Sequence, residues 1–287
     1  MQCTAVSQSA WRPEVDAFIQ KFQGKAGIFF RDLESHEEFR YHDSLCFPAA
    51  SLIKIPLFLA AGEKTGPWDW NMPVPVSMSN RAGGTGVIAR LNQSYVPTWR
   101  ELLFLSIAWS DNTAANQIID CIGGFSAVQD WLCRKGAAHT CLERKMMDRQ
   151  AAAAGKENMT SAADMGEILS RAVLHEADAM PQSVSAMLVE DMKHQQYRNK
   201  LPAMIPAESS SSAGRPSPGH VLVWNKTGDL GRIQHDAGIF TLPSGRRYIL
   251  VICTEHGQDG QCGCRWIAEV SRCIWKSLAG RNADELY

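Results

Sequence analysis

The sequence has no long apolar run and no block of charges of one sign. No window of about 18 uninterrupted apolar residues occurs in it, which argues against a membrane-spanning helix. Its 29 basic and 30 acidic residues are mixed along the chain, and the formal net charge is -1. This balance gives no electrostatic reason to expect nucleic acid or an anionic membrane as a partner. A small, roughly neutral substrate fits the composition better.

A secretory signal and a disulfide framework are also missing. Met1 to Ala10 lacks the basic start and the apolar centre of a signal. We expect a cytoplasmic protein as the sequence stands, or a periplasmic or secreted one if a leader was removed. The nine cysteines are odd in number and irregularly spaced, which favours reduced thiols. Cys262-Gly263-Cys264 has no Cys/His pair at finger-like spacing to complete a metal site, so we expect no metal and no cofactor.

Hydrophobic periodicity predicts strands near both ends of the chain and helices between them. Strands are predicted at 26–33, 38–41, 220–227, 235–242 and 247–253. Helices are predicted at 11–22, 52–61, 102–109, 113–122, 125–135, 160–174, 186–194 and 265–278. Thr98 and Glu101 have the spacing of a capping box at the start of the third helix. Segments 62–96 and 139–158 are expected to be mainly irregular.

This order of elements predicts a mixed α/β and all-α architecture in a single domain, 1–287. Segments of about 1–50 and 220–287 are expected to form one mainly antiparallel sheet flanked by the terminal helices. The residues between them, about 51–219, are expected to form an inserted helical subdomain. The Ser-rich stretch 207–219 has the composition of a flexible surface loop. Nothing in the pattern indicates an oligomeric state.

Ser51 precedes an apolar run from Leu52 to Ala61, and Lys54 follows it by one helical turn. On a helix this spacing puts the serine and the lysine on one face, so that the amine can reach the hydroxyl. Unpaired backbone N–H groups at the helix N-terminus suit an oxyanion that forms when a serine attacks a carbonyl. Taken alone, these four residues are more often a capping serine and a solvent-facing lysine.

Three short motifs occur in chain order: Ser51-x-x-Lys54, Ser110-Asp111-Asn112 and Lys226-Thr227-Gly228. The first opens a predicted helix, the second joins two predicted helices, and the third ends a predicted strand. This triple resembles the signature of class A β-lactamases and penicillin-binding proteins. The resemblance covers most of the chain. It includes Phe47-Pro48-Ala49-Ala50, Gly84-Thr85-Gly86, Arg100-Glu101-Leu102-Leu103, the segment Ser110 to Asn116, and His235-Asp236-Ala237-Gly238-Ile239.

The resemblance implies a β-lactamase/DD-peptidase-like fold and a set of catalytic roles. Ser51 is then the acylated nucleophile, and Lys54 is its general base. Ser110, with help from Lys226, passes a proton to the leaving group. Lys54 can act as a base only if it is desolvated or lies near another cation, and Lys226 supplies that neighbour.

The resemblance also implies how a substrate is held. Asn112 holds the substrate amide, and Thr227 binds a substrate carboxylate or a similar acceptor group. Gly228 and Asp229 continue this substrate-binding segment, and the backbone N–H groups of Ser51 and Asp229 form the oxyanion hole. By contrast, we interpret Asp111 also as a helix cap and His235 as a satisfied residue of the sheet.

The resemblance fails in the omega loop. Class A β-lactamases share a glutamate in this loop, and it activates the water that cleaves the acyl-enzyme. Following Leu142-Glu143-Arg144 forward in this sequence places Met146 at that position. A thioether cannot take a proton from water, so fast hydrolysis by that route is not expected. Asp148 and Glu143 are the candidate substitutes, and each is also explained as a solvated or ion-paired loop residue.

The sequence therefore predicts a serine hydrolase or acyltransferase that forms an acyl-enzyme on Ser51. Its substrate would be a small-molecule or peptide-like amide or ester, and its deacylation would differ from that of a resistance enzyme. Two alternatives remain. One is a β-lactamase with an unusual deacylation base, and the other is a non-catalytic acyl-binding or penicillin-binding sensor whose output is a long-lived ester.

Overall fold

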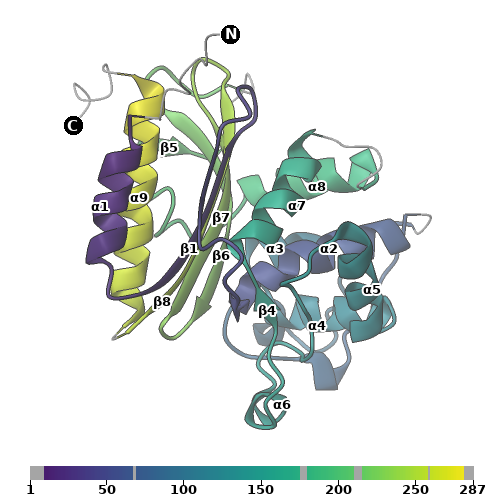
Figure 1. Cartoon of the computed structure of the whole chain (residues 1–287). Coiled ribbons are helices and arrows are strands. Elements are labelled where there is room, and N and C mark those ends of the chain that lie inside the picture. The colour runs from purple at the N-terminus through teal and green to yellow at the C-terminus, as the bar shows by residue number, and fades with distance from the viewer. Residues whose placement is uncertain (1–9, 67–68, 175–179, 210–214, 258, 281–287) are drawn as a thin grey trace.

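Six strands form one sheet with helices on both of its faces (Figure 1). The computed structural model describes residues 10–66, 69–174, 180–209, 215–257 and 259–280. The strand order is β2-β1-β8-β7-β6-β5, and all neighbours are antiparallel except β5 and β6. The strands are β1 (Gly24–Asp32), β2 (Glu38–Tyr41), β5 (Ala207–Glu208), β6 (Val221–Leu230), β7 (Ile233–Thr241) and β8 (Arg247–His256).

The two terminal helices cover one face of the sheet. Figure 1 shows α1 (Arg12–Lys21), in purple, beside α9 (Gly260–Ala279), in yellow. The side chains of α9 at Ile267, Val270 and Ile274 are fully buried there, as their helical spacing predicts. No helix within the described ranges is long and apolar enough to cross a membrane.

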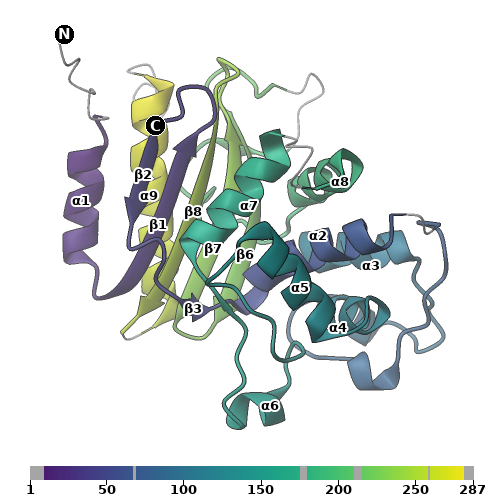
Figure 2. The same cartoon turned by 45° about the vertical axis from the view of Figure 1, so that its right-hand side comes forward.

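The other face carries the helical subdomain that the sequence predicts between the strands. Figure 2 shows α7 lying against the sheet, with the remaining helices beyond it. The helices are α2 (Lys54–Lys64), α3 (Trp99–Ala108), α4 (Asn112–Cys121), α5 (Phe125–Lys135), α6 (Arg149–Ala153), α7 (Ala162–Leu174) and α8 (Gln182–Lys193). Successive residues of β8 alternate between the two layers, because strand side chains point to opposite faces. Ile249 and Val251 enter the helical core, whereas Leu250 and Ile252 face the terminal helices.

The structure confirms the predicted fold class and corrects several local predictions. Residues 207–208 form β5, which pairs with the start of β6, where the sequence predicts a flexible loop. Of that predicted loop, 210–214 lie outside the described residues. Strand β6 continues past Lys226-Thr227-Gly228 to Leu230, because its pairing with β7 extends that far. The helix predicted at 186–194 begins earlier, at Gln182, directly after Pro181.

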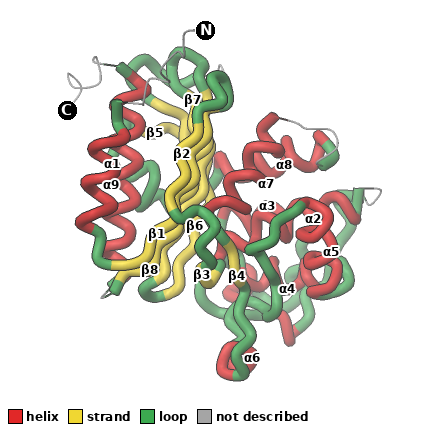
Figure 3. The backbone as a smooth tube through the Cα atoms, viewed as in Figure 1, coloured by secondary structure: helices red, strands yellow, loops and turns green. Residues whose placement is uncertain are grey.

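Three further short elements are absent from the sequence-based prediction. Strands β3 (Phe47–Pro48) and β4 (Met159–Thr160) pair with each other, and α6 lies in the segment expected to be irregular (Figure 3). Strand β3 leads directly into the segment that carries Ser51, so its pairing with β4 anchors that segment. Elements of two to five residues are too short to show a periodicity, which is why the sequence pattern did not indicate them.

Candidate active site

Ser51 lies in a short 3-10 helix, Ala50–Ile53, that runs directly into α2. The sequence predicts an α-helix here, so the geometry of this turn is a correction. Ala50 has a φ of +46°, a left-handed conformation that is rare for a residue with a side chain. Lys54 is the first residue of α2, and its Nζ lies 3.2 Å from Ser51 Oγ. The predicted contact between the serine and the lysine is therefore present.

Lys54 is completely buried and surrounded by polar oxygens. Its Nζ donates to the backbone oxygen of Ser110 over 2.6 Å and to Asn112 Oδ1 over 2.8 Å. Burial lowers the pKa of Lys54 well below its ordinary value, and the charge of Lys226 lowers it further, while Asp111 acts in the opposite direction. A lysine with a lowered pKa loses its proton more readily, and its free amine can then accept the Ser51 proton.

Ser110 stands between the two lysines. Its Oγ lies 3.2 Å from Lys54 Nζ and accepts a hydrogen bond of 2.9 Å from Lys226 Nζ. The backbone of Ser110 is left-handed, with a φ of +51°, which is the second strained position of the site. Burial lowers the pKa of Lys226 to about 7, with Asp229 opposing the shift and Lys200 adding to it. This chain of hydroxyl and amine groups can move a proton away from Ser51.

Asp111 fixes the loop that carries Ser110. As expected it caps α4, because its Oδ1 accepts from the backbone N–H of Ala114 over 2.9 Å. Its Oδ2 also accepts from the backbone N–H groups of Val87 and Ile88, over 2.6 and 2.9 Å. One buried carboxylate thus joins two loops and holds Ser110 at its strained φ.

Replacing Gly86 by alanine is expected to destabilise this junction by roughly 2–4 kcal/mol. Gly86 has a φ of +107°, and an added Cβ would lie 2.3 Å from Asp111 Cγ. Thermal unfolding measures the effect. Gly83→Ala is the matched control, because a Cβ there meets no atom within 4 Å, and its stability should stay close to that of the parent protein. Equal melting temperatures for the two variants would contradict this account.

Strand β6 brings the third motif beside Ser51. An added Cβ at Gly228 would lie 3.3 Å from both Ala49 O and Ala50 Cβ, so the strand passes close to the residues before the serine. Thr227, one residue earlier, and Asp229, one residue later, both line the same cavity as Ser51. Gly228 therefore serves the close approach of two backbones rather than a contact of its own.

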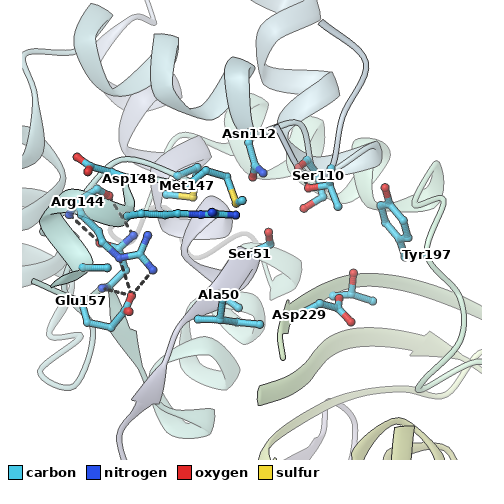
Figure 4. A pocket seen from close by; sticks show the side chains of 18 of the residues that line it. Ala50, Ser51, Ser110, Asn112, Arg144, Met147, Asp148, Glu157, Tyr197 and Asp229 are labelled. Carbon is cyan, nitrogen blue, oxygen red and sulfur yellow. Dashed lines mark hydrogen bonds and ion pairs between the residues drawn. The ribbon is translucent and has the colours of Figure 1, made fainter. Parts of the chain in front are cut away.

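The three motifs and the loop that carries Met146 enclose a cavity of about 710 Å³ (Figure 4). Ser51 lies near its centre, with Arg144, Asp148 and Glu157 on one side and Tyr197 and Asp229 on the other. Such a volume suits a small or peptide-like molecule. The residues predicted from the sequence that line it are Ser51, Ser110, Asn112, Asp148, Thr227 and Asp229.

Asn112 links the cavity to the buried lysine. Its Oδ1 accepts from Lys54, and its Nδ2 donates to the backbone oxygen of Gly83 over 2.9 Å. The side chain is thereby held in one orientation at the edge of the cavity. His235 lies outside this set. Its Nε2 donates to Pro48 O over 2.9 Å, and burial lowers the pKa of the ring to about 4, so it is the satisfied sheet residue that we expected.

Met146 lines the cavity on the side of the omega loop and is 7% exposed. Asn116 fixes its backbone from both sides. The Met146 N–H donates to Asn116 Oδ1 over 2.7 Å, and Asn116 Nδ2 donates to Met146 O over 3.2 Å. A thioether thus occupies the position that the resemblance assigns to a carboxylate, and the loop around it is ordered by hydrogen bonds and by the ion pair between Arg144 and Glu157, 2.7 Å apart.

The two substitute bases lie in different places. Asp148 lines the cavity, but its Oδ1 accepts from the backbone N–H of Ala151 over 2.9 Å and so caps α6. Glu143 does not line this cavity. It is exposed and lines a separate hollow with Phe125 and Lys156. The structure therefore brings Asp148, and not Glu143, to the same cavity as Ser51.

The segment from Gln196 to Lys200 was not predicted from the sequence as part of the site. Gln196, Tyr197, Arg198 and Asn199 line the cavity, and Lys200 is fully buried behind it. The segment follows the helix predicted at 186–194. It is a run of mainly polar residues, which is typical of a surface loop. A lysine without exposed surface has no local sequence signal, because its partners come from strands β6 and β7.

One group of possible metal ligands occurs within the described residues. His256, Asp259 and Cys262 offer ligand atoms that lie within 4.8 Å of one another. Asp259 already caps α9, because its Oδ1 accepts from the Cys262 N–H over 2.9 Å, and the positive end of that helix disfavours a cation. The helix cap explains this cluster.

The fold and the paired serines and lysines define a β-lactamase-like acylating serine enzyme. The chain belongs to the Beta-lactamase enzyme family, whose model matches residues 10–278. A β-lactamase of Bacteroides uniformis is 24% identical over 253 residues, which cover 83% of this chain and 81% of that protein.

Solved structures agree with this assignment. A β-lactamase from Sphaerobacter thermophilus DSM 20745 has a TM-score of 0.80 at 26% identity, covering 92% of this chain and 95% of that one. A mutant of PBP-A, solved as an acyl-enzyme complex with penicillin G, has a TM-score of 0.79 at 22% identity, covering 93% and 95%. At that identity, PBP-A shows a shared fold alone.

Proposed function

We propose that this protein is a serine hydrolase or acyltransferase whose acyl-enzyme on Ser51 is formed readily and removed slowly. The observation that carries the proposal is the buried Lys54 amine, 3.2 Å from Ser51 Oγ, with its pKa lowered by burial. In acylation, the Ser51 proton passes to Lys54 while Oγ bonds to the substrate carbonyl carbon. Ser110, backed by Lys226, then delivers a proton to the leaving group.

Slow removal of the acyl group follows from the loop opposite Ser51. A general base for water must lie within hydrogen-bond reach of it, and Met146 offers none. The substrate classes that fit are small amides, esters and peptide-like acyl donors, including β-lactams. Asn112 would hold the substrate amide, and the backbone N–H groups of Ser51 and Asp229 would bind the oxyanion.

The test is mass spectrometry of the protein incubated with a fluorogenic penicillin. The proposal expects an adduct on Ser51 that persists for many minutes, with little release of product. No adduct with β-lactams or activated esters, on a protein shown to be folded, would remove the catalytic proposal. A stable ester with every donor offered would instead favour the alternative of a non-catalytic acyl-binding sensor.

A β-lactamase with an unusual base is the second candidate, and the place of Asp148 favours it. Its carboxylate lines the cavity on the side of Met146, and the curated relative from Bacteroides uniformis is named a β-lactamase. This candidate expects rapid turnover that is lost in Asp148→Ala and kept in Met146→Ala. Slow turnover that is unchanged in Asp148→Ala would rule it out.

The acylation rate constant is expected to rise with pH, because only an uncharged Lys54 can accept the Ser51 proton. The charge of Lys226 helps to lower the pKa of Lys54. In Lys226→Met that cation is gone, so the pKa of Lys54 rises. The rising part of the plot of acylation rate constant against pH, its ascending limb, then moves to higher pH. The pKa of Lys226 is itself about 7, so the difference is largest below neutral pH.

Stopped-flow acylation measured across the pH range tests this shift. The position of the limb matters here, since loss of Lys226 also slows the reaction at every pH. Lys193→Met is the control, because Lys193 pairs with Glu190 on the surface and its removal should leave the limb in place. If the limb stays fixed in Lys226→Met, then Lys226 does not set the charge of Lys54.

A further inference from the structure

A third buried lysine lies behind the substrate-binding strand. Lys200 has no exposed surface, and its Nζ donates to Asp229 Oδ1 over 2.8 Å, to Gly228 O over 3.0 Å and to His235 O over 3.2 Å. Gly228 and His235 are partners across β6 and β7. One ammonium group therefore joins these two strands and holds the side chain of Asp229.

The carboxylate of Asp229 is presented to the cavity. The side chain is half exposed and lines the cavity, while Lys200 binds only its Oδ1. Its Oδ2 has no hydrogen-bond partner in the part of the chain that the structure describes. Figure 4 shows Asp229 with Tyr197 on one side of Ser51, across from Arg144.

The cavity and its walls carry other charges besides Asp229. Lys226 acts electrostatically on Asp229, but its buried Nζ donates to Ser110 Oγ and to Thr227 O. Arg149 lines the cavity too and begins α6, directly after Asp148. Arg144 lies on the opposite side and is paired with Glu157. The guanidinium of Arg198 donates to the backbone oxygen of Val223 over 3.0 Å. Lys200 compensates the charge of Asp229, but it does so from the buried side, so the exposed oxygen remains a hydrogen-bond acceptor.

Asp229 and Thr227 lie on the same side of β6, since they are two residues apart in a strand. Their Cα atoms are therefore about 7 Å apart. A substrate carboxylate at the Thr227 hydroxyl would face a like charge at that range, whereas a hydrogen-bond donor there could reach Asp229 Oδ2. The resemblance implies a substrate carboxylate at Thr227. The negative charge of Asp229 on the same side of β6 would repel such a carboxylate.

We propose that the acyl donor carries a neutral or cationic hydrogen-bond donor, rather than a carboxylate, on the part that lies along β6. Asp229, oriented by Lys200, is then a specificity-determining residue for this substrate class. The inference rests on the proposed acylation of Ser51. It adds the chemical class of the substrate part that lies along β6, for which the resemblance implies a carboxylate.

Three thioesters with one acyl group and different thiols test the preference. The thiols are thioglycolate, its neutral amide and thiocholine, which are anionic, neutral and cationic. Attack by Ser51 forms the Oγ–C bond and breaks the C–S bond. The serine proton passes to Lys54, and the thiol leaves with a proton from Ser110 or as the thiolate. A thiol reagent follows release, mass spectrometry confirms the Ser51 adduct, and Ser51→Ala supplies the background.

The parent protein is expected to be acylated by the thiocholine and amide esters faster than by the thioglycolate ester. In Asp229→Asn the ratio of cationic to anionic rates should fall roughly tenfold, because a negative charge that attracts the cationic ester and repels the anionic one is removed. Asparagine keeps an oxygen for Lys200, and the ratio cancels any common change in oxyanion binding. Asp148→Asn removes a charge from the other side of the cavity and should leave the ratio nearly unchanged.

The outcomes separate this inference from the proposed function. Two results would overturn the role of Asp229 and leave the proposed function standing. One is a parent protein that prefers the thioglycolate ester, and the other is a ratio of cationic to anionic rates that is equal in Asp229→Asn and the parent. A fall of the same size in Asp148→Asn would show a general effect of charge and would equally overturn it. No acylation by any thioester or by penicillin would remove the proposed function, and this inference with it.

Discussion

Ser51→Ala is expected to yield a folded protein that no β-lactam or activated ester can label. Ser51 Oγ lies 3.2 Å from Lys54 Nζ and near the centre of the cavity. Removing it leaves no nucleophile for the acyl-enzyme, so the loss of labelling should be complete rather than partial. Stability should change little, because the deletion removes one polar atom from a partly exposed residue.

Ser110→Ala is the matched control for that result. Ser110 also lies 3.2 Å from Lys54 Nζ, and it also lines the cavity. In the proposed mechanism Ser110 relays a proton, so its loss should slow acylation by roughly 10²-fold or more without abolishing the adduct. Intact mass after penicillin treatment and thermal unfolding together measure both variants. A persistent label on Ser51→Ala, or complete loss only in Ser110→Ala, would reassign the nucleophile.

Local signals in the sequence were enough to predict most of the fold. The 125–135 helix and the 38–41 strand match α5 and β2 residue for residue, and the capping box of Thr98 and Glu101 is present in both directions. These elements depend on periodicity and on capping by near neighbours, which any window of sequence contains. The three motifs likewise predicted which residues the fold would bring together, although they are spread between positions 51 and 228 of the sequence.

The parts that the sequence did not predict depend on polar contacts between distant residues. Lys200 acts on β6 and β7, and Asn116 holds the backbone of Met146 thirty positions away. A lysine and an asparagine in polar surroundings read as surface residues, since these types are usually exposed. Their burial becomes visible only when their acceptors are placed around them. The chemistry of the cavity walls was therefore less predictable than that of the catalytic motifs.

The two residues of the site with left-handed backbones were likewise not predictable from the sequence. Ala50 and Ser110 have φ values of +46° and +51°, although neither is glycine. Such strain persists only where the surroundings over-determine it. At Ser110 the contacts of Asp111 supply that constraint. At Ala50 the anchoring of the preceding β3 by β4 contributes to it. The strained turns thus direct both serines toward Lys54.

Met146→Glu is expected to shorten the lifetime of the acyl-enzyme by roughly 10²- to 10⁴-fold, the range that a positioned general base contributes. Met146 lines the cavity, and the backbone bonds with Asn116 hold the residue in place whatever its side chain. Burial raises the pKa of a new carboxyl group toward neutrality, which suits a base for water. Stability should fall by about 1–3 kcal/mol, because a polar group enters a nearly buried position.

Met146→Gln separates base catalysis from the effect of polarity. Glutamine has nearly the same size and carries the same burial cost, but its amide cannot accept a proton from water at neutral pH. The acyl-enzyme of Met146→Gln should therefore persist as in the parent protein, while that of Met146→Glu decays with release of the hydrolysed product. Adduct decay followed by mass spectrometry distinguishes them. If Met146→Glu acylates normally and its adduct persists, then the missing carboxylate at this position is not what makes deacylation slow.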